Sequence, residues 1–207
     1  GSFGGVVLVG GVPLQSRGQD DWIVARLDPA TGETIWASQI GGSESDNARG
    51  IAMGPDGTVY AVGWFRSQIL VGSDVLTSAG NTDALVAALA YEDGSARWGR
   101  RGGGPSFDLA LDVEVATPSV FPVTFGDLPQ EPPVLVTGYV DGEVTFSAPD
   151  GDLALSAQDR DGFLVAYGTD DTAGRILTGD VYDVSDLSGV AVTQSYETGA
   201  PGQGMFA

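Results

Sequence analysis

Carboxylates are the side chains of this sequence whose number and placement suggest a chemistry. The 207 residues include 28 Asp and Glu against nine basic residues, which gives a formal net charge of −19. Because the sequence contains neither His nor Cys, it lacks the Ser-His-Asp and Cys-His nucleophiles, imidazole zinc ligands and disulfides. What remains open is hydrolysis by two acids or the binding of a hard cation.

The acids that stand out follow paired glycines or cluster in expected loops. Asp46 and Asp108 each come four residues after a Gly-Gly pair, and Asp residues gather in DRDG (159–162) and DVYDVSD (180–186). Neither cluster has the ligand spacing of an EF-hand. The sequence therefore predicts no catalytic residue, no metal ligand and no cofactor, and the ligand-binding residues stay unknown. Calcium is the metal that such oxygen ligands would suit. We interpret Asp46 and Asp108 as caps that accept hydrogen bonds from nearby backbone N–H groups.

Charge and hydropathy limit the partners. Nine scattered Arg residues cannot neutralise a phosphate backbone, so the sequence predicts no nucleic-acid partner. No apolar stretch approaches the roughly 18–20 residues of a membrane span.

A long tandem repeat organises these residues. Trp98 lies 62 residues after Trp36, and at the same offset Gly103-Gly104 falls on Gly41-Gly42 and Asp83 on Asp21. We divide the single domain, 1–207, into repeats at 1–62, 63–137 and 138–207. A proline-rich insert, 117–133, interrupts the second repeat and is expected on the surface. The third repeat is truncated, with Ile176 or Leu177 in place of the Trp, which indicates a window from a longer array.

Each repeat reads as several short strands. Runs such as TVYAVGWF and DWIVARL are separated by turn residues, and no window has a helical period. We predict an all-β fold, a β-propeller-like tandem repeat of antiparallel four-stranded blades in an incomplete ring with open edges. Consecutive apolar positions require burial of both strand faces between stacked blades.

The recurring motifs are expected to join these blades. Trp36 and Trp98 would pack between neighbouring blades, and the paired glycines would turn the chain back toward the axis. The surplus length at 2–19, 64–82 and 139–160 would form a hairpin extension on one rim.

These motifs resemble a known repeat family. DWIVARLD, GETIW, IGG, DNARGIA and GTVYAVGWF are similar to the bacterial SBBP-type β-propeller repeats of secreted and surface proteins. The resemblance implies a propeller located outside the cell, on its surface or in the periplasm. It also implies a binding or display role, with further blades of a longer chain as neighbours, and transfers no catalytic residue.

Three functions remain open. The leading hypothesis is a non-enzymatic scaffold or binding module that presents loops and rim hairpins to a protein or glycan. LDPATGETIW (27–36) is also similar to the tryptophan-docking repeat of quinoprotein (PQQ-type) propellers and of outer-membrane-assembly scaffolds, although the 62-residue period and the lack of a cysteine pair argue against a quinone site. A carboxylate-based glycosidase or lyase is the third, without a recurrent acid pair to support it.

Overall fold

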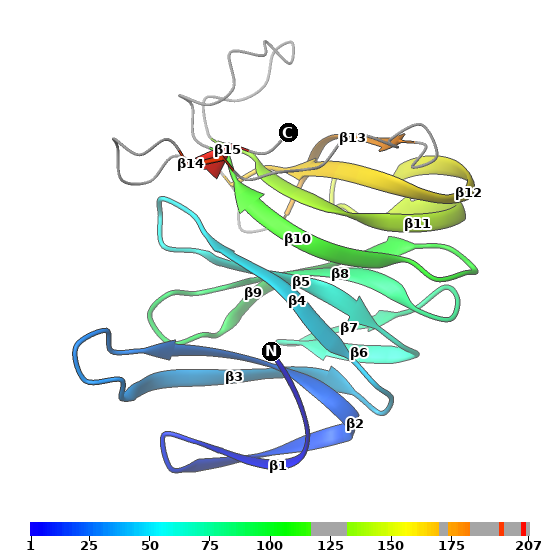
Figure 1. The fold of residues 1–207 in the computed structure, drawn as a ribbon. Helices are drawn as coiled ribbons and strands as arrows, with labels where there is room; N and C mark the ends of the chain where they lie inside the picture. The colour runs from blue at the N-terminus through cyan, green and yellow to red at the C-terminus, as the bar shows by residue number, and fades with distance from the viewer. Residues whose placement is uncertain (117–131, 170–173, 183–194, 197–203, 206–207) are drawn as a thin grey trace.

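The fold is all-β and antiparallel. The computed structural model describes residues 1–116, 132–169, 174–182, 195–196 and 204–205, and within these ranges it contains strands and no helix (Figure 1). Among the described residues, then, nothing helical is available to span a membrane. The strands are β1 (Ser2–Val9), β2 (Val12–Leu27), β3 (Thr34–Gly42), β4 (Asn47–Met53), β5 (Val59–Phe65), β6 (Gln68–Val71), β7 (Asp74–Thr77), β8 (Asp83–Leu89), β9 (Ala96–Gly103), β10 (Leu109–Val115), β11 (Val134–Phe146), β12 (Leu153–Tyr167), β13 (Ile176–Tyr182), β14 (Ser195–Tyr196) and β15 (Gly204–Met205).

Three antiparallel meanders stack in layers. Meander A consists of β1, β2 and β3, meander B of β4, β5, β8 and β9, and meander C of β10, β11, β12 and β13. Figure 1 shows them in chain order, from blue meander A to the green and yellow strands of meander C. Within each meander, every strand pairs with the next strand of that meander along the chain.

A hairpin arm links each meander to the one before it. Arm B is β6–β7 (68–77), and arm C is the distal part of β11 and β12 (141–156). Arm B pairs with the end of β3 through Gly41↔Leu70, and arm C pairs with the end of β9 through Gly103↔Thr145. The sequence predicts these segments as rim extensions, whereas the structure shows that they reach back to the preceding meander. Each pairs there with the last strand of that meander, β3 or β9, which we call its outer strand.

Two hydrophobic cores fill the spaces between the meanders. One core joins residues of meanders A and B, such as Trp22, Trp36 and Phe65, and the other joins meanders B and C. Every residue of β8 is buried, since its two faces contact different cores. This confirms that consecutive apolar positions mark strands covered on both sides.

Irregularities in strand pairing recur at equivalent places. The register of the outer strand pair shifts at Arg26/Leu27, at Ala88/Leu89 and at Ala166/Tyr167. Opposite these points, Arg26 faces Trp36 and Ala88 faces Trp98, but Ala166 faces Thr178. The expectation that Ile176 or Leu177 replaces the Trp is therefore wrong, because the preceding turn is two residues longer in the third repeat.

Two features singled out in the sequence fall largely outside the described residues. Of the insert at 117–133, the structure describes Pro132 and Pro133 alone, and of DVYDVSD it describes 180–182.

Candidate functional site

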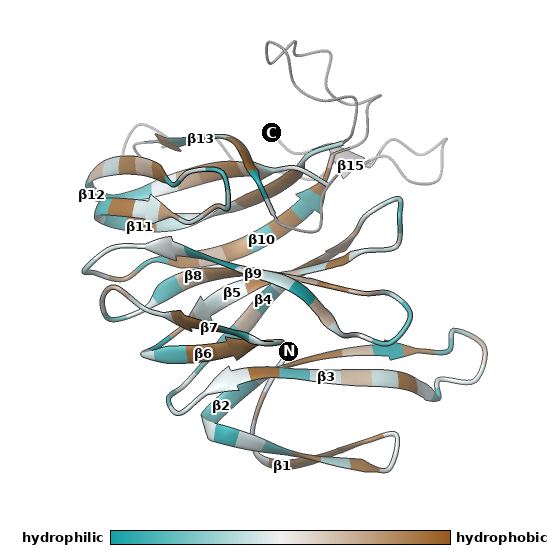
Figure 2. Cartoon of the chain, turned by 180° about the vertical axis from the view of Figure 1, so that it is seen from behind, coloured by the Kyte–Doolittle hydropathy of each residue, from teal (hydrophilic) through white to brown (hydrophobic). Residues whose placement is uncertain are grey.

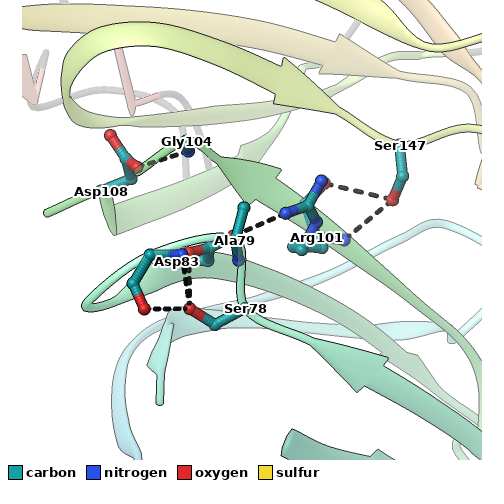
Figure 3. Close-up of polar contacts among 8 residues, drawn as sticks. Ser78, Ala79, Asp83, Arg101, Gly104, Asp108 and Ser147 are labelled. Carbon is teal, nitrogen blue, oxygen red and sulfur yellow. Dashed lines mark hydrogen bonds and ion pairs between the residues drawn. The ribbon is translucent and has the colours of Figure 1, made fainter. Parts of the chain in front are cut away.

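Asp108 fastens arm C to meander B. Its Oδ2 accepts a hydrogen bond from the Gly104 backbone N–H at 2.7 Å, and its Oδ1 accepts one from the Asp141 backbone N–H at 2.9 Å. Gly104 follows the outer strand of meander B, and Asp141 begins arm C. One carboxylate therefore joins two consecutive repeats. Figure 3 shows its contact with Gly104.

Asp46 makes the same junction one repeat earlier. Its Oδ2 accepts from the Gly42 N–H at 2.7 Å and its Oδ1 from the Arg66 N–H at 3.1 Å. Both Asp side chains are fully buried. The prediction that Asp46 and Asp108 cap backbone N–H groups is confirmed, and the structure adds that these groups belong to different meanders.

A second buried Asp in each of the first two repeats, Asp21 and Asp83, accepts hydrogen bonds from residues that follow the hairpin arm of the same repeat. Asp83 accepts hydrogen bonds from the Ser78 hydroxyl at 2.9 Å and the Ala79 N–H at 3.1 Å, and it forms an ion pair with Arg101 at 3.0 Å (Figure 3). In the first repeat, Asp21 accepts from the Arg17 N–H at 3.1 Å and from Gln39 Nε2 at 2.6 Å. In the sequence, the match of Asp83 to Asp21 at the 62-residue offset marks these two acids as equivalent. The match does not show which groups they contact, so no role can be assigned to them from the sequence alone.

The paired glycines allow these groups to approach closely. A Cβ on Gly103 would lie 2.6 Å from the Asp83 Cγ and 3.0 Å from the Asp108 Oδ2. Neither Gly41, Gly42, Gly103 nor Gly104 has a positive φ. The expectation that they turn the chain sharply is therefore wrong: the first three lie in extended strands and serve close packing.

The two carboxylates that join consecutive repeats, Asp46 and Asp108, have raised pKa values. Burial raises the pKa of Asp46 and of Asp108 to about 6, although the backbone N–H donors act in the opposite direction. Facing carboxylates add to the rise: Asp21 and Glu44 at the first junction, Asp83 and Asp141 at the second.

This shift predicts that mild acid stabilises the protein. Because the folded-state pKa of each Asp lies above its unfolded value, the folded state binds more protons than the unfolded state between about pH 4 and 6. The free energy of unfolding therefore increases as the pH falls through this range, and the increase is lost as the pH rises through about 6. We expect Tm to be at least about 3 °C higher at pH 5 than at pH 7 by calorimetry. Below about pH 4 it should fall again, since hydrogen bonds lower the pKa of other acids such as Asp28 and Asp93.

The matched variant is Asp46→Asn with Asp108→Asn, which removes both titrating groups. It should flatten the rise in Tm between pH 7 and pH 5. An unchanged slope in the double variant, or no slope in the parent, would contradict the assignment.

The Arg101–Asp83 ion pair gives a second prediction. Arg101→Ala leaves a fully buried carboxylate with two of its three partners and should lower the free energy of unfolding by about 2 kcal/mol. Arg101→Gln copies the donor that the first repeat uses at Gln39 and should cost less than about 1 kcal/mol. Urea unfolding measures both, and equal losses would exclude a specific contact.

The tryptophans contact the turn of the following repeat. Trp36 Nε1 donates to the Tyr91 carbonyl oxygen at 2.8 Å, and a Cβ on Gly94 would lie 2.5 Å from the Trp36 ring. One repeat later, a Cβ on Gly174 would lie 2.8 Å from the ring of Trp98. The predicted packing of Trp36 and Trp98 against the next repeat is confirmed.

Two open clefts lie between meanders A and B. One, of about 320 Å³, is bordered by arm B and is lined by Arg17, Gln39 and Leu70 among others. The other, of about 260 Å³, is more apolar and is lined by Trp36, Ile51, Met53 and Tyr91 among others. The Arg26 guanidinium stacks 3.6 Å from the centre of the Tyr91 ring at this second cleft. These volumes fall at or below the lower end of small-molecule sites.

The buried acids are arranged for structure rather than for catalysis. A general acid must reach its substrate, yet both oxygens of Asp46 and of Asp108 are held by backbone N–H groups inside the fold. Within the described ranges, no three Asp or Glu side chains gather as a cation would require. For DRDG, the structure places Asp161 Oδ2 3.1 Å from the Gln158 N–H, again a contact that supports an arm.

No protein-family model matches this chain, and no curated protein is significantly similar to it.

Proposed function

We propose that the three meanders are blades of an incomplete β-propeller, and that the protein is a non-enzymatic, extracytoplasmic scaffold or binding module. In this proposal it presents loops and rim surfaces to a protein or glycan partner. The observation that carries the proposal is that its most conspicuous repeated residues, the Trp, the Gly-Gly pair and the buried Asp, all serve contacts between consecutive repeats. The resemblance to SBBP-type repeats supports the location.

The apolar cleft between meanders A and B is the surface that best suits a partner. Ile51 and Met53 are each 61% exposed beside it, and Trp36 and Tyr91 supply aromatic surface. Exposed apolar side chains next to aromatic rings are typical of the centre of a recognition surface. Since arms B and C are paired with neighbouring strands, we propose this cleft and the turns beside it as the main contact surface for the partner.

A binding screen tests the proposal. Immobilised glycans and a displayed peptide library are probed with the whole chain and with Met53→Glu, which places a charge at the cleft. We expect binders that lose at least tenfold in affinity in the variant, whereas the exposed control Val75→Glu on arm B retains them. Turnover of a substrate that is abolished by replacing acids of this chain would overturn the non-enzymatic proposal.

A further inference from the structure

Meander A carries the same receiving features as meanders B and C, but in the described structure nothing covers them. The first feature is the turn that receives a tryptophan. Gly32 has φ +72° and Gly94 has φ +70°, and each donates its N–H to the carbonyl oxygen four residues earlier. Gly94 lies against Trp36, whereas a Cβ on Gly32 would meet no atom within 4 Å.

The second feature is the arm. Arm A (6–15) lies 62 residues before arm B, and both reverse direction at a glycine of positive φ, Gly10 and Gly72. Arms B and C each pair with an outer strand of the preceding meander, and Val71 is 1% exposed there. Arm A has no such partner among the described residues, and Val7 and Val9, the equivalents of the buried Ile69 and Val71, are half-buried. Strand β1, which carries them, lies at the edge of the stack and is coloured largely as apolar (Figure 2).

The third feature is the face of the central strand. Leu89 of β8 is completely buried against meander A, while Leu27 at the equivalent position of β2 is 53% exposed. The residue at this position is buried in both repeats that follow a meander, as Leu89 in the second and as Tyr167 in the third. These three features lie on different elements, and each one is occupied in the next repeat.

We infer that this face of meander A binds the outer strand of another repeat, with the sequence pattern W-x4-G-G-x3-D. The pattern follows from the two occupied junctions, where Trp36, Gly41-Gly42 and Asp46, and again Trp98, Gly103-Gly104 and Asp108, make the contacts. The Trp would cover Gly32, the glycines would pair with Val7 and Leu8 of arm A, and the Asp would accept from the N–H of Gly4.

A second copy of this chain fits the face less well. Its β3 and β9 already pair with arms B and C, and its β13 presents Thr178 where the pattern has Trp. The partner is therefore a repeat with an intact Trp and Gly-Gly pair. This inference deepens the proposed propeller and rests on it, because it extends the same blade-to-blade junction to one more blade.

Thiol labelling tests the inference, because the chain has no native Cys. Residues 1–62 are duplicated in front of Gly1, which keeps the repeat in phase, and Val7→Cys is placed in the original copy. We expect this arm A thiol to react at least tenfold more slowly in the duplicated chain than in the parent chain carrying Val7→Cys alone. The matched control carries Trp36→Ala and Gly42→Val in the added copy alone and should restore fast labelling.

A peptide of residues 93–108 supplies the strand without requiring an added repeat to fold. It should protect the arm A thiol of the parent chain, whereas the same peptide with Trp98→Ala should not. If neither the duplication nor the peptide slows the labelling of the arm A thiol, the inference is overturned. Protection of this thiol in the parent chain that increases with protein concentration would assign the face to a second copy instead.

A second thiol keeps the two proposals apart. Ile69→Cys places this arm B thiol where a strand already covers the arm, so it should react slowly in the parent chain. If the arm B thiol reacts slowly while the arm A thiol reacts fast in the parent chain, in the duplicated chain and with the peptide, the inference fails but the proposed propeller does not. If the two thiols react equally fast in the parent chain, the arm-to-strand junction is absent and the proposed propeller fails with it.

Discussion

Replacing Gly104 with Ala is expected to lower the free energy of unfolding by at least about 3 kcal/mol. A Cβ at this position would overlap the Glu143 carbonyl oxygen of arm C, and one at Gly42 would overlap the Gln68 carbonyl oxygen of arm B. These are backbone atoms, so the clash is relieved only when the arm separates from the outer strand. Gly42→Ala should therefore be comparably destabilising.

The matched control is Gly11→Ala. A Cβ on Gly11 meets nothing within 4 Å, but the residue holds φ +81°, so this variant carries backbone strain without a clash. It should cost about 1 kcal/mol. Urea unfolding monitored by tryptophan fluorescence compares the three variants. A loss for Gly104→Ala no larger than that of Gly11→Ala would show that the arm does not approach the strand closely.

Trp98→Ala is the second large effect, with an expected loss of about 3–5 kcal/mol. Trp98 is 3% exposed, and the centre of its ring lies 6.0 Å from that of Tyr60 and 6.1 Å from that of Tyr167. Its removal opens a cavity at the centre of the core between meanders B and C. Trp36→Ala should cost less, about 2–3 kcal/mol, because Trp36 borders an open cleft.

Tyr182→Ala provides the comparison for this series. Tyr182 is 46% exposed on β13, so its replacement should cost less than about 1 kcal/mol. Equal losses for Trp98→Ala and Tyr182→Ala in chemical unfolding would contradict the placement of Trp98 in a sealed core.

The repeat and the strands could be read from the sequence because their signals are local. The recurrence of Trp36 at Trp98 and the consecutive apolar residues of β5 and β8 correctly indicated antiparallel strands buried on both faces. The caps at Asp46 and Asp108 were also predictable, since an Asp shortly after a glycine pair is typical of a residue that binds backbone N–H groups.

What the sequence did not reveal depends on contacts between repeats. The paired glycines suggested a turn, but their function is to admit the backbone of an arm that begins more than 20 residues later. In the third repeat a longer turn before β13 places Thr178 at the position that Trp36 and Trp98 occupy in the first two. Counting residues along the sequence cannot detect this shift. The supporting roles of Asp21 and Asp83 likewise arise only when an arm folds over them.

The central claim is that arms B and C are each fastened to the meander before them, and hydrogen exchange tests this most directly. Arms A and B are equivalent in sequence position, but β6 of arm B pairs with β3 as well as with β7, whereas within the described residues β1 of arm A pairs with β2 alone. Peptides covering 68–71 should exchange at least tenfold more slowly than peptides covering 6–9 in the same chain. Equally fast exchange in the two arms would contradict the account.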